Sequence, residues 1–260
     1  MTTNVRDLIR SLPLKEMDGT LLAAEIRERS RTLWPISQFK DYDSTTVDYA
    51  IDFAAYFHRE QRRRNRGDLP KDPYINHPLR NALRLLRYGV TDIGVVIAAI
   101  LHDTLEDCEA EMAKAGGYPE TGDPHGIPTY DYAYDLLERS FGVDVAMLVE
   151  AVTNPTWTSG STKAQKRAEY IKNVTKEIKD PRVWLIKFTD WVDNAAGLYH
   201  NVGGKEMVEH LTAKYLPLAD IFLREFDSHV HALITPEGFK AIQTHIEQGR
   251  ASLTKLAREA

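Results

Sequence analysis

One imidazole and three carboxylates lie close together at the end of an apolar segment of this chain. The segment, Ala-Ala-Ile-Leu at 98–101, is followed by His102, Asp103, Glu106 and Asp107. At about 3.6 residues per helical turn, His102 would share a helix face with Glu106, and Asp103 with Asp107. Carboxylates this close repel one another, and a bound cation relieves that repulsion. The sequence therefore predicts a metal site here, with further ligands supplied from elsewhere in the chain.

Two other places carry side chains that could complete such a site. His77 precedes a proline where a helix is expected to begin, a position more typical of a capping or packing histidine. Asp190 lies inside an apolar helix, with Asn194 one turn later on the same face. A carboxylate there costs free energy unless it is paired, for example with Lys187, or bound to a metal. A basic run at 62–66 is typical of a solvated surface, with phosphate binding as the alternative.

The composition is that of an ordinary globular chain. Its 260 residues are 43% hydrophobic and 27% charged, which is enough for a sizeable core in one domain. The net charge of −5 argues against a general nucleic-acid or membrane-surface binder. The single cysteine, Cys108, excludes an internal disulfide and fits a reducing compartment. The N-terminus lacks the apolar core of a signal peptide, and the longest apolar run, at 93–101, is too short to span a bilayer, so we expect a cytoplasmic protein.

The periodicity is helical nearly throughout, which predicts an all-α fold in a single compact domain. Gly89 ends one helix, Thr91 is the expected cap of the helix that carries His102, and a kink or break is expected near Pro217. Helices are expected at about 21–26, 47–64, 78–88, 91–103, 130–140, 143–152, 163–178, 180–199, 205–226 and 236–257.

The chain divides into a central core with helical extensions at both ends. We expect an N-terminal helical extension over 1–44, a core over 45–200 and C-terminal helices packed on the core over 201–260. Four glycines and three prolines within 114–130 predict a loop insertion in the core. Because this insertion follows closely on the predicted metal site, it is either a lid or a passive surface loop.

Four motifs taken together resemble those of the HD-domain phosphohydrolases. Within that group they are most similar to the pyrophosphohydrolase domain of RelA/SpoT-type alarmone enzymes and to the small stand-alone alarmone hydrolases, such as the animal SpoT homologue. The resemblance covers about residues 45–200 and implies the helical HD fold. Because the residues that remain are too few for a synthetase-like domain, we expect a protein with the hydrolase activity alone. The motifs are His-Arg-Glu-Gln-Arg-Arg at 58–63, Pro-Tyr-Ile-Asn-His-Pro at 73–78, Ala-Ala-Ile-Leu-His-Asp-Thr-Leu-Glu-Asp at 98–107 and Leu-Ile-Lys-Phe-Thr-Asp-Trp-Val-Asp-Asn at 185–194.

The resemblance also implies a metal centre and a pair of catalytic acids. The family's usual ion is manganese, and mixed imidazole and carboxylate ligands suit other divalent metals as well. Glu106 and Asp107 match the pair that orients and deprotonates the attacking water. The implied metal ligands are His77, His102, Asp103 and Asp190.

Three further residues match positions that contact the nucleotide. Arg63 matches an arginine that packs on the base, a contact that suits a planar guanidinium. Asn194 matches a residue on the sugar side, and Lys187 is a candidate for neutralising phosphate charge. The chain departs from the family where arginine and histidine are usual, because Trp191 and Asp193 stand there.

The sequence therefore predicts metal-dependent hydrolysis of the 3′-pyrophosphate of alarmone nucleotides, (p)ppGpp or (p)ppApp, with release of pyrophosphate. Stand-alone hydrolases of this kind also serve as antitoxins to an alarmone synthetase, and that role stays open. One alternative is an HD phosphohydrolase acting on NADPH or a deoxynucleotide. Another is a module that senses a nucleotide without turnover. The expected partner is a nucleotide, with no nucleic acid and no membrane, and the oligomeric state is open.

Overall fold

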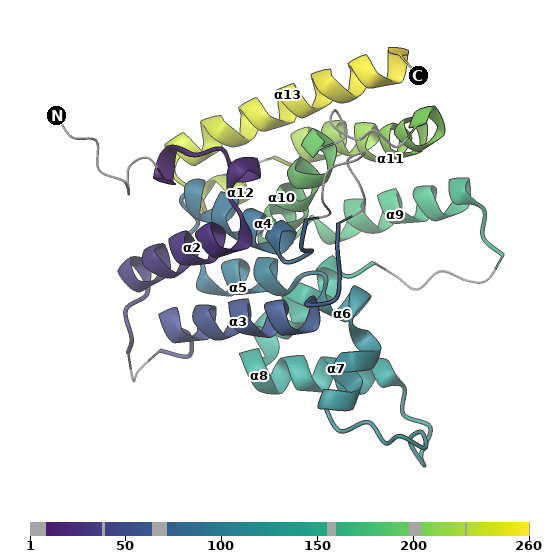
Figure 1. Cartoon of the computed structure of the whole chain (residues 1–260). Coiled ribbons are helices and arrows are strands. Elements are labelled where there is room, and N and C mark those ends of the chain that lie inside the picture. Colours follow the sequence, from purple (N-terminus) through teal and green to yellow (C-terminus); the bar gives the residue numbers. More distant parts are fainter. Residues whose placement is uncertain are drawn as a thin grey trace.

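Helices make up nearly all of the regular structure (Figure 1). The structure is a computed structural model that describes residues 9–37, 40–63, 72–154, 160–197, 204–226 and 228–259. Within these ranges no strand is present, and an isolated bridge pairs Arg62 with Pro73. The all-α prediction is confirmed. The helices are η1 (Leu14–Glu16), α2 (Gly19–Leu33), α3 (Ser44–Phe57), α4 (Asn76–Arg87), α5 (Ile93–Leu101), α6 (Thr104–Asp107), α7 (Glu109–Ala115), α8 (Thr129–Val152), α9 (Lys163–Glu177), α10 (Pro181–Gly197), α11 (Gly204–Glu225), α12 (Ser228–His231) and α13 (Pro236–Glu259).

Short polar side chains decide where several helices begin. Asp43 starts α3 with a capping box that also uses Thr46, so this helix begins before residue 47. Asp92, and not Thr91 as predicted, caps α5, because its carboxylate accepts from the backbone N–H groups of Gly94 and Val95 at 2.9 and 3.3 Å. The prediction that the helix after residue 47 continues to 64 is also wrong, since α3 ends at Phe57.

The helix that carries His102 does not continue through the acidic residues. It ends at Leu101, and the short helix α6 begins at Thr104, so a single helix through all four residues is not present. Asp103 and Asp107 are still one turn apart, because the Asp107 N–H donates to the Asp103 carbonyl at 2.9 Å. The His102 ring bonds to the Ala99 carbonyl at 3.0 Å, and the Thr104 hydroxyl bonds to the Leu101 carbonyl at 2.7 Å. These side-chain bonds compete for the carbonyls that a continuing helix would use.

Three other predictions concern chain breaks. The break expected between 140 and 143 is confirmed, because Gly142 interrupts α8 with a φ of 78° that favours glycine. The loop expected within 114–130 is confirmed for 116–128, between α7 and α8. Near Pro217 a kink or a break was expected, and helix α11 runs through this residue as one element, which excludes the break. The expected end of α10 near residue 199 lies outside the described residues.

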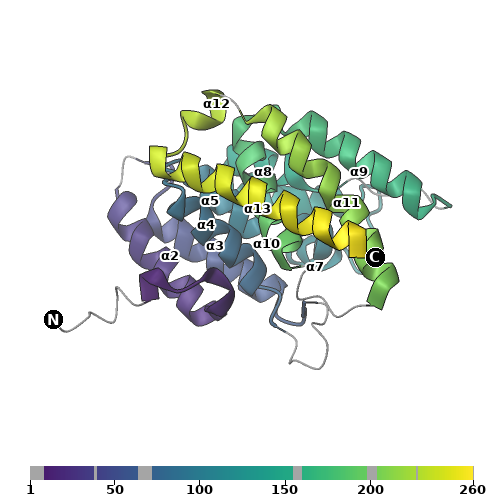
Figure 2. The same ribbon diagram turned by 90° about the horizontal axis from the view of Figure 1, so that it is seen from above.

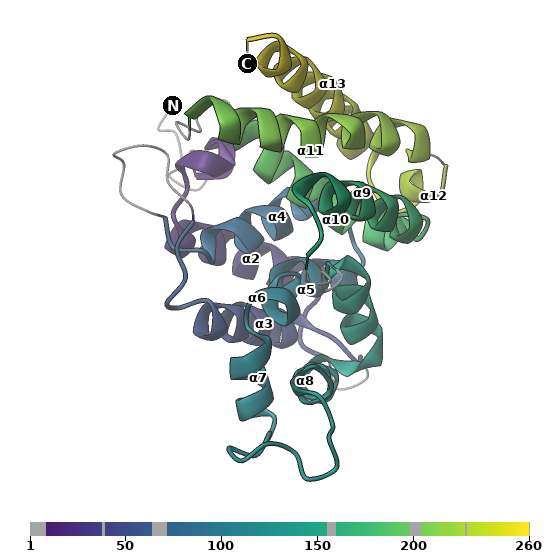
Figure 3. The ribbon, with the colours of Figure 1, turned by 90° about the vertical axis from the view of Figure 1, so that its right-hand side faces the viewer.

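The core surrounds α5, whose residues from Gly94 to Leu101 are all buried. Helices α3, α4, α8 and α10 pack against it, and α2 covers α3 and α4. Figure 2 shows α13 lying across α10 and α11, which agrees with its contacts. Figure 3 places α7, α8 and the 116–128 loop at the end of the molecule opposite α13. The lid role of this loop and the division into core and extensions stay predictions.

Across the described ranges, no helix is both long and apolar enough to cross a membrane.

Candidate metal centre

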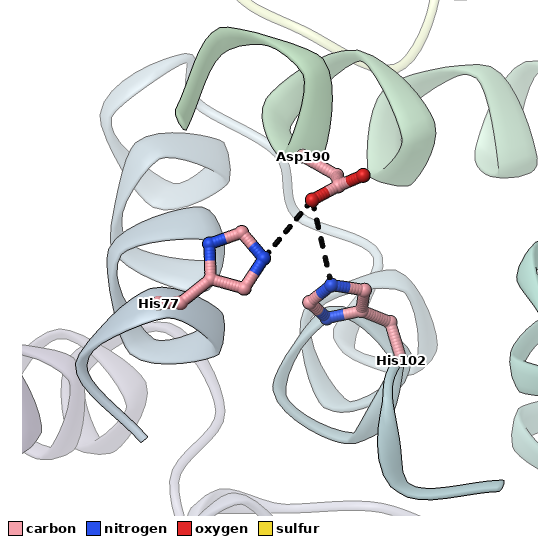
Figure 4. A group of neighbouring side chains, drawn as sticks. All are labelled: His77, His102 and Asp190. Carbon is pink, nitrogen blue, oxygen red and sulfur yellow. Dashed lines mark ion pairs between the residues drawn. The ribbon is translucent and has the colours of Figure 1, made fainter. Parts of the chain in front are cut away.

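Helices distant in sequence bring two imidazoles and a carboxylate together (Figure 4). His77 comes from the first turn of α4, His102 from the residue after α5, and Asp190 from the middle of α10. Asp190 Oδ1 lies 3.0 Å from His77 Nε2 and 3.7 Å from His102 Nε2. Ligands that share an ion through bonds of about 2.1 Å stand roughly 3 to 3.5 Å apart. The group therefore has the spacing that a divalent cation needs.

Asp103 lies against the same two imidazoles. Its Oδ2 atom is 3.0 Å from His102 Nε2 and 3.6 Å from His77 Nε2. The Tyr74 hydroxyl donates to this oxygen at 2.7 Å and fixes the direction of the carboxylate. The residue expected as a fourth ligand thus lies beside the other three.

The hydrogen-bond partner of Nδ1 in each histidine shows whether Nε2 is free to bind a metal. His77 Nδ1 lies 2.8 Å from Asp193 Oδ2, and His102 Nδ1 lies 3.0 Å from the Ala99 carbonyl. Each of these acceptors holds a proton on Nδ1, which leaves the Nε2 lone pair directed at the cluster. His102 Nε2 is buried and makes no hydrogen bond with any residue that the structure describes. The donor set therefore fits a bound divalent cation.

The electrostatics of the cluster point the same way. Burial acts to lower the pKa of His102, but the charges of Asp103 and Asp190 outweigh it and raise that pKa well above its usual value. Burial acts to raise the pKa of Asp190, yet the two histidines hold it well below its usual range. The carboxylates thus favour positive charge on the His102 imidazole. A divalent ion would replace that proton as the source of positive charge.

The two acids expected to handle water lie at the rim of the cluster. Glu106 accepts from the Asn154 side-chain amide at 2.8 Å and from its backbone N–H at 3.2 Å, which fixes the carboxylate. Partial burial, with the charges of Asp103 and Glu106, raises the pKa of Asp107 to about 6. A carboxyl group with this pKa exchanges protons near neutral pH, as a general base must.

The residues expected to contact the nucleotide also gather here. The Arg63 guanidinium donates to Asn194 Oδ1 at 2.8 Å, and the Asn194 amide donates to Asp190 Oδ1 at 2.7 Å. Lys187 stands on α10 one turn before Asp190 and is 5% exposed. Residues 64–66 of the basic run lie outside the described part of the chain.

Asp193 has a role that its sequence context did not predict. Its side chain is fully buried and is held by Arg80 at 2.9 and 3.1 Å, by Arg84 at 3.4 Å and by Lys15 at 3.0 Å, while it binds His77. The signal was present in two arginines, one turn apart, on the apolar helix that follows His77. A buried arginine pair requires an anion, and Asp193 supplies it.

Trp191, the other departure from the family, is a packing residue. Its indole N–H donates to the Tyr215 carbonyl at 3.0 Å, and its ring fills the space above Gly249 of α13. A side chain on Gly249 would collide with this ring, since a Cβ there would lie 2.5 Å from it.

Comparison with known proteins agrees with the geometry. The family model described as "HD domain" matches residues 50–220. The chain belongs to the HD domain family. Family membership implies a divalent metal, and His77, His102 and Asp190 are where the described residues could hold one.

Several relatives are named guanosine-3′,5′-bis(diphosphate) 3′-pyrophosphohydrolase. The Aquifex aeolicus protein is 29% identical over 220 residues, a match that covers 82% of this chain and 27% of that protein. The Drosophila melanogaster protein MESH1 is 30% identical over 161 residues, covering 62% of this chain and 73% of MESH1. Human MESH1 is 40% identical over 107 residues, covering 40% of this chain and 45% of that protein. The chain therefore spans about a quarter of the Aquifex relative.

Proposed function

We propose that this protein is a metal-dependent hydrolase that removes the 3′-pyrophosphate of (p)ppGpp or (p)ppApp and releases pyrophosphate. The observation that carries the proposal is the cluster of His77, His102 and Asp190 with two further acids at its rim. The similarity to proteins named as (p)ppGpp 3′-pyrophosphohydrolases supports the substrate class. The proposed setting is the cytoplasm, and the proposed ion is Mn²⁺.

Each residue of the centre has a proposed part. His77, His102 and Asp190 would hold the ion, and Asp103, 3.0 Å from His102, would complete the set. When bound, such an ion acidifies water and polarises a phosphate oxygen. Asp107, with its pKa near 6, would take a proton from the attacking water, while Glu106, fixed by Asn154, would orient that water.

The nucleotide would lie beside Arg63 and Asn194. A planar guanidinium stacks on a base, and the Asn194 amide reaches the sugar side while staying in contact with Asp190. Lys187 would neutralise phosphate charge next to the metal ligands.

A substrate panel tests the proposal. Purified protein with Mn²⁺ is incubated with ppGpp, pppGpp, ppApp, pppApp or NADPH, and the products are separated by chromatography. We expect pyrophosphate from at least one alarmone and no turnover by the His102→Ala, Asp103→Ala double variant. Orthophosphate from NADPH alone would favour an NADPH phosphatase. Nucleotide binding without any product, in folded and metal-loaded protein, would favour a sensing module.

The proposal includes an antitoxin role where an alarmone synthetase acts as a toxin. Co-expression with such a synthetase tests it directly. Growth should be restored by the wild-type chain and not by the double variant.

A further inference from the structure

A group of hydrogen-bond donors lies beside the metal centre on α9, α10 and α11. We call Tyr170, Lys187, Lys214 and Tyr215 the Lys/Tyr face. Lys214 Nζ is 4.2 Å from the centre of the Tyr170 ring and 5.1 Å from that of Tyr215, and Lys187 Nζ is 5.9 Å from the Tyr170 ring. Two ammonium groups therefore share one aromatic ring. Lys214 belongs to none of the sequence motifs that predicted the site.

The polar atoms of the Lys/Tyr face have no partners within the described structure. Neither ammonium group forms an ion pair or hydrogen bond there, and neither phenol hydroxyl forms a hydrogen bond. Lys187, Tyr170 and Tyr215 are 5%, 6% and 7% exposed. None of these polar atoms is among the fully buried side-chain atoms of the described residues that lack a hydrogen-bond partner, so they keep some access to solvent. The unpartnered donors are therefore available to a ligand that supplies several acceptors.

The Lys/Tyr face adjoins the metal centre. Burial lowers the pKa of both Lys187 and Lys214, and the carboxylates of Asp190, Glu106 and Asp103 act on both in the opposite direction. The same three carboxylates act on the Tyr170 and Tyr215 hydroxyls. A ligand between the two regions would therefore meet metal ligands at one end and donors at the other.

The spacing of residues along helix α10 determines the order in which they would contact a bound nucleotide. Lys187, Asp190 and Asn194 are spaced three and four residues apart, so they lie along one face over roughly 10 Å. Arg63 joins the Asn194 end, and Lys214 joins the Lys187 end through Tyr170. A nucleoside at the Asn194 end would place a 3′-phosphate at Asp190 and a second, linked phosphate against the Lys/Tyr face.

We propose that Lys214, together with Lys187, Tyr170 and Tyr215, forms the subsite for the outer phosphate of a 3′-pyrophosphate and so selects nucleotides with two linked phosphates over those with one. This inference rests on the proposed function. In that reaction the water oxygen bonds to the inner phosphorus, and the bond from that phosphorus to the ribose 3′ oxygen breaks. Asp107 takes one proton from the water, an equal proton ends on the leaving 3′ oxygen, which becomes a hydroxyl, and pyrophosphate leaves with its charge on the donors.

Anion binding tests the subsite without relying on turnover. Inorganic pyrophosphate and orthophosphate are titrated calorimetrically into the full chain at a fixed free Mn²⁺ concentration. Lys214→Met removes the charge and keeps an apolar stem on Tyr170, while Lys214→Arg keeps a cation. Lys205→Ala is the matched control on α11, because that lysine is 72% exposed. Thermal melts and Mn²⁺ titration check that each variant is folded and loads metal.

We expect Lys214→Met to weaken pyrophosphate binding roughly 10- to 100-fold and orthophosphate binding less than about 3-fold. Lys214→Arg and Lys205→Ala should stay within about 3-fold of wild type for both anions. An equal loss for both anions in Lys214→Met, or no loss, would overturn the subsite.

The substrate panel separates this result from the proposed function. If wild type cleaves no alarmone but Lys214→Met still loses pyrophosphate selectively, the subsite stands and the proposed reaction fails. If wild type releases pyrophosphate and Lys214→Met binds it normally, the reaction stands and the subsite fails.

Discussion

The two histidines of the metal centre are held in opposite ways. His102 bonds through Nδ1 to the Ala99 carbonyl, three residues earlier in the same turn of chain. His77 bonds through Nδ1 to the carboxylate of Asp193, which comes from a helix more than a hundred residues later. One imidazole is oriented by local backbone geometry, and the other by a buried charge.

The two histidine rings differ in how much of the fold must form before each ring is oriented. The bond of His102 forms whenever α5 forms, because donor and acceptor belong to one short segment. The bond of His77 exists only when α4, α10 and η1 have packed, since Arg80, Arg84 and Lys15 must surround Asp193. Burial acts to raise the pKa of Asp193, but His77, Lys15 and Arg80 hold it well below its usual range. The orientation of His77 therefore depends on more buried charges than that of His102, and it is lost if any of these helices packs incorrectly.

The largest expected effect comes from removing that charge. Asp193→Ala leaves two buried arginines without their anion, and we expect a loss of about 3 to 5 kcal/mol in the free energy of unfolding. Urea denaturation measures it. The control is Asp144→Ala, which breaks a half-exposed pair with Arg182 and should cost about 1 kcal/mol or less. Similar small losses in both variants would show that the buried network does not stabilise the fold.

Removal of the metal tests whether His77 and His102 together bind an ion. If the ion binds the folded chain alone, a metal concentration 100-fold above its Kd stabilises by about 2.7 kcal/mol, and chelation removes this gain. We expect EDTA to lower the melting temperature of wild type in differential scanning calorimetry. The double variant His77→Ala, His102→Ala should melt at the same temperature with and without EDTA. A fall of equal size in both proteins would place the ion elsewhere.

A gentler substitution separates charge from hydrogen bonding. Asp193→Asn keeps an acceptor for His77 but removes the negative charge, and we expect Mn²⁺ affinity to fall roughly 10- to 100-fold. The comparison on the other side is Thr104→Val, which removes the bond to Leu101 and leaves the His102 bond in place. Its Mn²⁺ affinity should stay within about 3-fold of wild type in calorimetric titration. An equal fall in Mn²⁺ affinity in both variants would contradict the proposal that only His77 depends on a buried charge.

The pH dependence should show the smallest effect. Asp107 must be ionised to accept a proton, so with a pKa of about 6 we expect kcat/KM to fall as pH drops below 6. Two pH units, from 7 to 5, should lower it about 10-fold. Asp193 has a lowered pKa, so its stabilising contribution is lost only below the ordinary carboxyl range. Circular dichroism should therefore stay constant while activity falls, and a parallel loss of helix would contradict the assignment to Asp107.

The fold could be predicted because its signals are local, whereas the ligand set of the centre followed from the resemblance of four separated motifs to a known family. Helical periodicity, capping residues and the Gly142 break depend on neighbours along the chain. The break after Leu101 escaped prediction because it depends on which carbonyls His102 and Thr104 reach with their side chains. The expected cap at Thr91 was wrong by one residue. The extended backbone at Asp92 directs its carboxylate toward the first free N–H groups of α5, and this direction is not evident from the sequence.

The order of residues along the chain is enough to say which residue types could hold a metal and which helices carry them. Three contacts are known from the packed helices alone: Asp193 orients His77, Trp191 packs on α13, and Lys214 lies above Tyr170. These contacts depend on how α4, α9, α10, α11 and α13 are rotated and displaced relative to one another. Helical periodicity states which side of a helix is apolar, but it does not state which residue of another helix that side meets.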